Sequence, residues 1–168
     1  MCVFSGRLPS PRRRALLLLV WLLACSWAGP LGAQTGADIA VVVHPDVAID
    51  NLTLPELRRI LLGDREFWSA GVRVTLLIRA PIARERDIAV QSVCQMTEAQ
   101  FRTHWIGKVL RAETPNTPKI VYSTEMGLDQ VARLPGAISF VPISQVGRSV
   151  KVLKIDGRAP GQAGYRLK

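Results

Sequence analysis

The sequence predicts an α/β fold, a single three-layer lobe built on a mixed, mostly parallel sheet. Apolar β-branched runs alternate along the chain with segments of helical periodicity, an alternation typical of this class. The chain has 168 residues, of which 48% are hydrophobic and 21% charged, the values of an ordinary globular domain. Length and composition allow one domain with a proper core, and they exclude a disordered chain or a multi-span membrane protein.

Residues 1–33 are predicted to be a secretory signal peptide. An apolar run of ten residues at 15–24 precedes the small residues at 32–33 and follows four arginines: Arg7, Arg12, Arg13 and Arg14. This run is shorter than the ~20 residues of a membrane-spanning helix. We expect cleavage after Ala33 and a periplasmic or secreted protein. The alternative is a lipobox at residues 22–25, in which lipid on Cys25 would anchor the protein to a membrane.

The net charge of +9 is concentrated at the two ends of the chain. Without the leader, 18 basic and 13 acidic side chains remain, and residues 147–168, a predicted basic C-terminal strand and tail, hold the whole excess of +5. The body of the chain, residues 34–146, has twelve basic and twelve acidic side chains. Because this body has no net charge and no interleaved aromatic and basic residues, we expect no nucleic-acid partner.

The first half of the single domain, residues 34–168, begins with a strand at 37–44 that is apolar enough to be buried on both faces. A helix follows, with Thr53 as N-cap and Glu56 closing a capping box, and it should end at Gly63. The next strand is expected at 72–78.

The second half continues the alternation of helices and strands. We expect a helix at 83–94 and another from the capping box of Thr97 and Gln100 to Arg111. The core-facing stripe of the second helix is predicted from its apolar spacing to be Phe101, Trp105 and Val109. Strands at 119–122, 137–141 and 149–155 and a helix at 124–134 complete the lobe.

Candidate ligand-binding residues follow three of the predicted strands. Open α/β sheets bind ligands beyond the carboxyl ends of their strands, where this chain has His44, Arg79, Ser123 and Thr124. Ser123 and Thr124 also begin a helix, whose free N–H groups attract anions, although N-capping is their alternative role. His44 is either a hydrogen-bond donor or a turn residue before Pro45.

Three segments resemble phosphate-type periplasmic substrate-binding proteins of ABC transporters. Residues 60–63 (ILLG) with Trp68 are similar to the "I-F-x-G … W" of that family, and residues 135–141 (PGAISFV) are similar to "P-G-A-I-G-Y-V". Residues 152–157 and 160–167 are similar to the closing "D-G-x-x-P … G-x-Y-P-L". The resemblance runs in order over about residues 38–167 and implies one lobe of a two-lobed clamshell.

The resemblance implies a non-catalytic protein that binds an oxyanion such as phosphate and works with an ABC permease or another envelope protein. Arg79 matches the family's anion-binding arginine, whereas residues 80–85 lack its acidic residue and its Ser-Gly-Thr. Arg84 and Arg86 are candidates to replace them, or else they form a solvated helix end with ion pairs of their own. The alternative function is a lobe that lost its ligand and serves as an interaction or sensory accessory module.

No catalytic or metal-binding motif is found. The sequence lacks a G-x-S-x-G elbow, a Walker loop and a G-x-G-x-x-G. Two histidines, with Cys94 on an apolar helix face, give no metal-ligand spacing, so we expect neither a metal nor a cofactor. Trp68 and Trp105 have apolar neighbours and are predicted to pack in the core.

Overall fold

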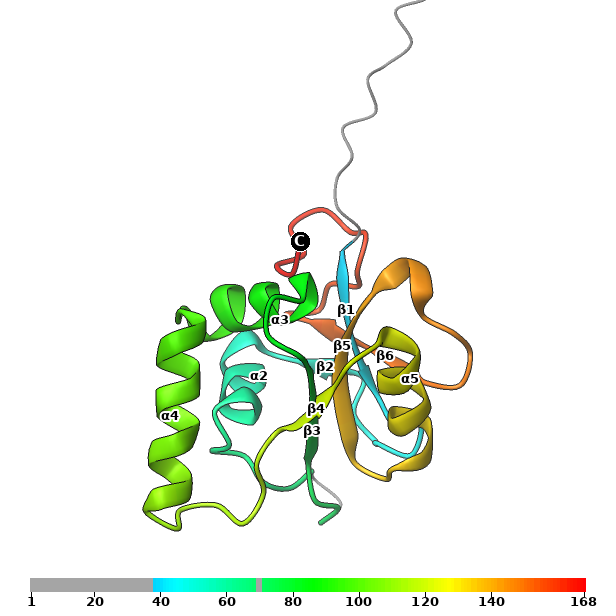
Figure 1. The fold of residues 1–168 in the computed structure, drawn as a ribbon. Helices are drawn as coiled ribbons and strands as arrows, with labels where there is room; N and C mark the ends of the chain where they lie inside the picture. Colours follow the sequence, from blue (N-terminus) through cyan, green and yellow to red (C-terminus); the bar gives the residue numbers. More distant parts are fainter. Residues whose placement is uncertain (1–37, 69–70) are drawn as a thin grey trace, which may run out of the picture. The chain divides into compact units, whose positions relative to one another are not determined.

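Six strands form one mixed sheet in the order β2-β6-β1-β5-β3-β4 (Figure 1). The computed structural model describes residues 38–68 and 71–168. The strands are β1 (Ile39–Val43), β2 (Asn51–Leu52), β3 (Thr75–Arg79), β4 (Lys119–Val121), β5 (Ala137–Pro142) and β6 (Lys151–Ile155). β1 runs antiparallel to β5 and β6, while the other three neighbouring pairs are parallel. The predicted mixed, mostly parallel sheet is therefore confirmed, and β1 is the strand that reverses.

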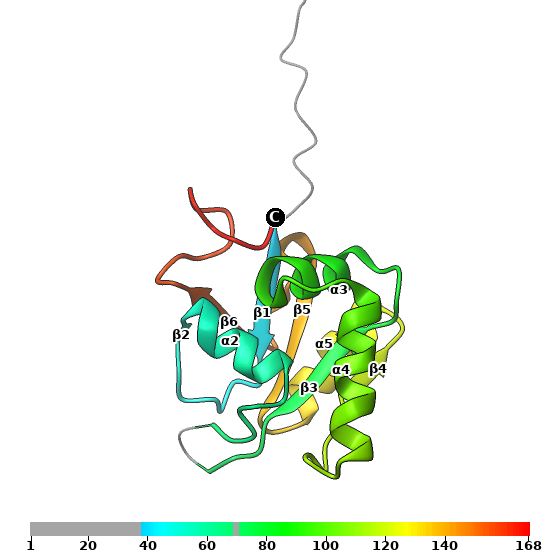
Figure 2. The same cartoon turned by 90° about the vertical axis from the view of Figure 1, so that its left-hand side faces the viewer.

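Helices cover both faces of the sheet, which gives the three predicted layers. On one face lie α2 (Leu54–Leu61), α3 (Arg84–Ile88) and α4 (Glu98–Leu110), in front of the strands in Figure 2, and on the other lies α5 (Thr124–Arg133). Buried side chains separate in the same way, because alternate residues of a strand point to opposite faces. Ile39, Val41 and Val43 join the core under α2 and α4, and Ala40 and Val42 join the core under α5.

The predicted signal peptide and the lipid site at Cys25 lie outside the described residues. None of the helices within 38–68 and 71–168 has the length and apolar character needed to cross a bilayer.

The structure differs from the sequence prediction in several details. The short strand β2 was not expected, and the second strand begins at Thr75 rather than at residue 72. The helix at 83–94 changes from α3 to a π-helical segment at Ala89–Cys94. Val109 was predicted to face the core but is 47% exposed, because α4 turns Phe101, Trp105 and Lys108 inward instead.

Both predicted capping boxes are present. The backbone N–H of Thr53 donates to Glu56 Oε2 at 2.9 Å, and the backbone N–H of Glu56 donates to Thr53 Oγ1 at 3.4 Å. Thr97 and Gln100 make the same two bonds at the start of α4. Each box satisfies two N–H groups that a helix start would otherwise leave without acceptors, and this fixes where α2 and α4 begin.

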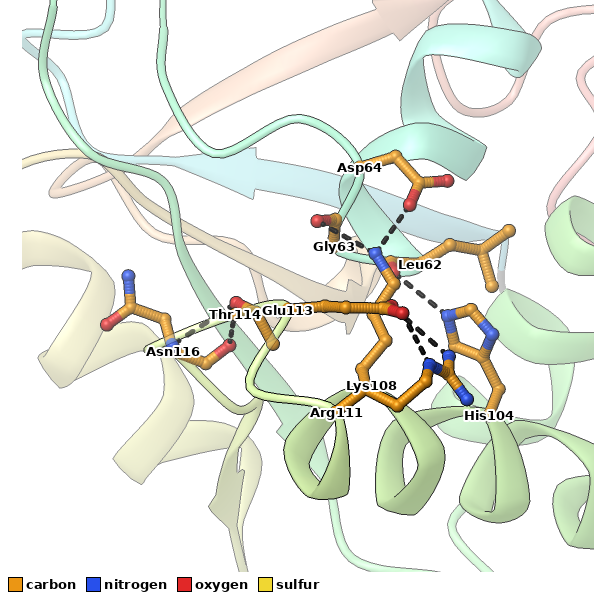
Figure 3. A network of polar contacts seen from close by, with 9 residues as sticks. All are labelled: Leu62, Gly63, Asp64, His104, Lys108, Arg111, Glu113, Thr114 and Asn116. Atoms are coloured by element: carbon orange, nitrogen blue, oxygen red, sulfur yellow. Dashed lines mark hydrogen bonds and ion pairs between the residues drawn. The ribbon is translucent and has the colours of Figure 1, made fainter.

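Side chains of α4 hold the C-terminal end of α2 (Figure 3). His104 Nε2 lies 3.0 Å from the Leu62 carbonyl oxygen, and Lys108 Nζ donates to Asp64 Oδ1 at 2.6 Å and to the Gly63 carbonyl at 3.3 Å. A Cβ on Gly63, where φ is +71°, would lie 2.6 Å from the Trp105 ring. A residue without a side chain is therefore required where the two helices meet.

We predict that Gly136→Ala destabilises the fold more than Gly157→Ala. Both glycines have φ near +75°, which costs an L-residue about 1–2 kcal/mol. Only at Gly136 would the new methyl group press on the Arg73 carbonyl and the Val72 side chain, adding about 1–3 kcal/mol of overpacking. Urea unfolding of the two variants measures the difference, and equal losses would contradict the close packing described here.

Candidate functional site

The parallel pair β3 and β4 brings the predicted anion-binding residues of two segments to one edge of the sheet. Arg79, the last residue of β3, is in register with Val121, and the backbone N–H of Ala80 donates to the Val121 carbonyl at 3.0 Å. Ser123 lies two residues after the end of β4 and is the N-cap of α5. Arg79, Ser123 and Thr124 therefore lie at the same carboxyl edge, as the sequence predicted.

The guanidinium of Arg79 is the most unusual group at this edge. Its side chain is 18% exposed, and its Nε and Nη1 atoms are buried without a hydrogen-bond acceptor among the described residues. Glu85 Oε2 lies 3.9 Å from Nε, close enough for an ion pair but too far for a hydrogen bond. Leaving a buried charged donor unbonded costs more than the ~1–3 kcal/mol of a neutral one. Arg79 therefore holds two donors suited to an acceptor from outside the chain.

The first turn of α5 is capped by Ser123 and carries an acidic residue, Glu125. Ser123 Oγ accepts from the backbone N–H of Met126 at 3.1 Å, so its capping role is present. The pKa of Glu125 is lowered by hydrogen bonds from its own backbone N–H and from Ser123, and further by the positive charge of Arg79. Thr124 is buried in the first turn. The helix start and Arg79 are thus within electrostatic reach of one another.

Arg86 is held by ion pairing and hydrogen bonding within the fold. Its Nε and Nη2 donate to the two carboxylate oxygens of Glu98 at 2.8 and 2.7 Å, and its Nη1 donates to the backbone carbonyl of Arg79 at 2.9 Å. Arg86 is therefore a positioning residue that fixes the backbone at Arg79 to α4. Arg84, the first residue of α3, is exposed, and its role as an anion donor stays a prediction.

His44 does not share the site. Because β1 runs antiparallel to β5, its C-terminal end lies beside the start of β5, where the backbone N–H of His44 donates to the Ala137 carbonyl at 3.1 Å. The expectation that His44 lies at the same edge as Arg79 is therefore wrong. His44 Nδ1 accepts from the backbone N–H of Asp46 at 3.2 Å, a turn contact.

Sequence reasoning missed two polar groups near α5. Glu125 was not considered, although its place in the first turn follows directly from the helix start. Ser139 Oγ is buried on β5 without a hydrogen-bond partner among the described residues, 3.6 Å from where a Cβ of Gly127 would lie. The signal for Ser139 was its replacement of a glycine in the family's motif.

The described residues were also searched for a metal site and for a reactive thiol. Within 38–68 and 71–168, no group of three or more His, Cys, Asp or Glu side chains is placed to hold a metal ion. Burial raises the pKa of the Cys94 thiol to about 11, so its nucleophilic thiolate form is scarce at neutral pH. A polar hollow of about 110 Å³ lies elsewhere, between the end of α2 and the segment before β4, and Arg65, Thr114 and Asn116 are among its lining residues.

Comparison with solved structures finds the same fold in phosphate-binding components of ABC transporters, whereas no protein-family model matches the chain. An ABC-type phosphate transport receptor from Vibrio cholerae superposes with a TM-score of 0.62 at 21% identity, over 78% of this chain and 53% of the receptor. A second match is a chain from Clostridium perfringens that is named as a phosphate ABC transporter substrate-binding protein and was solved with phosphate bound. It superposes with a TM-score of 0.61 at 20% identity, over 74% of this chain and 47% of the matched chain. PstS from Borrelia burgdorferi superposes with a TM-score of 0.60 at 14% identity, over 74% of this chain and 49% of PstS.

The structural neighbours of this chain are therefore phosphate ABC transporter substrate-binding proteins, as the sequence motifs indicated. The chain spans about half the length of each of these three proteins. At these identities the likeness establishes the fold, an α/β lobe of the periplasmic-binding-protein type. These neighbours are named as binding proteins rather than as enzymes.

We predict that Glu98→Gln lowers the free energy of unfolding by about 2–3 kcal/mol, because it removes the charged acceptor of buried Arg86. Asp129→Asn is the control, since the exposed pair of Asp129 and Arg133 is worth about 0.3–0.5 kcal/mol. Chemical denaturation of both variants measures the losses. A Glu98→Gln loss as small as that of the control would mean that Arg86 does not depend on this pair.

We also predict that Cys94 resists thiol reagents in the folded protein at pH 8 and reacts once the chain is unfolded. The pH lies below the raised pKa of about 11, so the thiol stays protonated as well as buried. Peptide mapping after alkylation, with and without denaturant, measures labelling at Cys94 itself. Full labelling of the native protein would contradict the buried position.

Proposed function

We propose that this chain is an exported, non-catalytic solute-binding protein that holds a small oxyanion such as phosphate between Arg79 and the N-terminal turn of α5. The observation that carries the proposal is the pair of buried N–H donors on Arg79 that have no acceptor in the described fold. A tetrahedral oxyanion offers several acceptor oxygens in a small volume, and guanidinium donors bind such oxygens as a fork.

The start of α5 supports the same ligand. A helix of this length presents the positive end of its dipole at its first turn. Ser123 and Thr124 add hydroxyl groups, and Arg84 adds a second cation at the start of α3. The nearby carboxylates of Glu85 and Glu125 lower the net positive charge, so we expect weaker binding than a purely cationic site would give.

The proposal extends to location and partners. A leader at 1–33 implies a periplasmic or secreted protein, with lipid on Cys25 as the alternative anchor. The named functions of the structural neighbours support an ABC permease or another envelope protein as the partner.

A second candidate function is an interaction module that uses the same edge of the sheet. Three large apolar side chains are exposed around it: Ile82 in the β3–α3 loop, which is 93% exposed, Tyr122 after β4 and Met126 in the first turn of α5. Aromatic residues and methionine are enriched in protein-binding surfaces relative to the rest of a protein surface. In this alternative, a carboxylate of an envelope partner would occupy Arg79 in place of a free anion.

We predict that Arg79→Ala weakens binding of phosphate by about 10- to 100-fold, the effect of losing charge-assisted hydrogen bonds. Arg79→Lys keeps the charge but loses the fork, and it should fall between Arg79→Ala and the wild type. Isothermal titration with phosphate, sulfate and molybdate measures the affinities. Arg133→Ala, at the far end of α5, is the matched control and should bind like the wild type.

The absence of heat with all three anions would overturn the oxyanion proposal and favour the interaction module. Equal binding by the wild type and Arg79→Ala would place any anion site elsewhere on the chain.

A further inference from the structure

Glu85 places its carboxylate beside the buried donors of Arg79. Oε2 of Glu85 lies 3.9 Å from Nε of Arg79, and the two side chains are only 12% and 18% exposed. This distance allows an ion pair but exceeds the length of a hydrogen bond, so Nε and Nη1 of Arg79 still find no acceptor among the described residues. A carboxylate in this position also opposes an anion at the same guanidinium, because like charges repel more strongly where little water separates them.

The two donors of Arg79 are closed off from solvent. Nε and Nη1 have almost no exposed surface, so a dissolved anion reaches them only when a neighbouring group moves. Glu85 lies against Nε. Displacing its side chain would therefore uncover this donor and remove the competing negative charge in the same step.

Residues 80–85, which connect β3 to the first turn of α3, are anchored at both ends. At one end, the backbone N–H of Ala80 donates to the Val121 carbonyl at 3.0 Å. Directly after the other end, Arg86 donates to the two carboxylate oxygens of Glu98 at 2.8 and 2.7 Å. A rearrangement between these two anchors can move Glu85 without separating β3 from its neighbours.

The turn within residues 80–85 is strained at Ile82. The backbone N–H of Ala83 donates to the Ala80 carbonyl at 3.3 Å, and Pro81 precedes Ile82, whose φ is +77°, as in a type II turn. Such a turn favours glycine at the position of Ile82, because a β-branched residue with positive φ crowds its own backbone. Ile82 is 93% exposed, so little packing offsets this strain. Ala83 also gives α3 no side-chain cap, whereas α2, α4 and α5 each have one.

We propose that residues 80–85 form a gate over the anion site, in which Glu85 is the internal counter-ion that an incoming oxyanion displaces from Arg79. This inference rests on the proposed function, because it concerns the same site. With the gate closed, as in the structure, Glu85 pairs with Arg79 Nε. When the turn at Ile82 rearranges, Glu85 moves away and the oxyanion takes its place, while the anchors at either end stay bonded. The strain at Ile82 lowers the free energy that opening requires.

The first test is isothermal titration of the full 168-residue chain and its variants with inorganic phosphate. Glu85→Gln keeps the size of the side chain and removes the competing charge, so it should bind phosphate about tenfold more tightly than the wild type. Asp87→Asn is the matched control, because it removes one negative charge from the same helix and leaves the pair of Glu85 and Arg79 in place. This control should bind like the wild type. Circular dichroism verifies that each variant is folded.

A second pair of variants tests the strain. Ile82→Gly fits the left-handed backbone and should stabilise the closed gate, so phosphate binding should weaken by about fivefold. Ile82→Ala removes most of the exposed side chain but keeps the Cβ that makes a positive φ unfavourable, and it should bind much like the wild type. Urea unfolding verifies that Ile82→Gly is the more stable of the two. Equal affinity of Ile82→Gly and the wild type would overturn a gate at this turn.

The outcomes for Glu85→Gln separate the gate from the site itself. Tighter binding by this variant, with no change in the Asp87→Asn control, supports the gate. Binding that is equal to or weaker than that of the wild type would overturn the gate and leave the proposed oxyanion site in place. The absence of phosphate binding by both the wild type and Glu85→Gln would overturn the proposed function, and the gate with it.

Discussion

The five residues of β1 lie at the centre of the sheet with no exposed surface, and the rest of the lobe is arranged around them. They alternate between the two cores, so β1 joins the layer of α2 and α4 to the layer of α5. The C-terminal tail closes on the same strand: the backbone N–H of Ile39 donates to the Leu167 carbonyl at 2.9 Å, and Tyr165 Oη donates to the Ile39 carbonyl at 2.7 Å. A strand buried on both sides must have all its polar backbone groups bonded, and this requirement constrains its neighbours.

The reversal of β1 also decides which residues share the candidate site. It moves His44 to the opposite edge, while the parallel pair β3 and β4 brings Arg79 to the start of α5. Arg86 then ties the backbone at Arg79 to Glu98 on α4. The sequence left two roles open for Arg86, an anion donor or an ion pair at a solvated helix end. It did not show that the pairing acid belongs to another helix, because such a contact depends on how helices pack.

The packing of α4 against α2 also explains why Val109 is exposed although the sequence predicted that it faces the core. Val109 follows Trp105 by about one helical turn and lies at the margin of the inward-facing stripe, where periodicity alone does not decide whether a side chain is buried. The contact of Gly63 with the Trp105 ring and the bonds of Lys108 to Gly63 and Asp64 fix the rotation of α4 about its axis. That rotation leaves Val109 at the half-exposed margin of α4.

The sequence by itself determined the class of fold, the two capping boxes, the buried first strand and the candidacy of Arg79, because each depends on neighbours a few residues away in the chain. Only the tertiary structure decided the direction of β1, the pairing of Arg86 with Glu98, the outward face of α4 and the burial of Arg79 donors that find no acceptor among the described residues. These features depend on contacts between distant segments, whose register and orientation are fixed when the layers pack and not by local propensity.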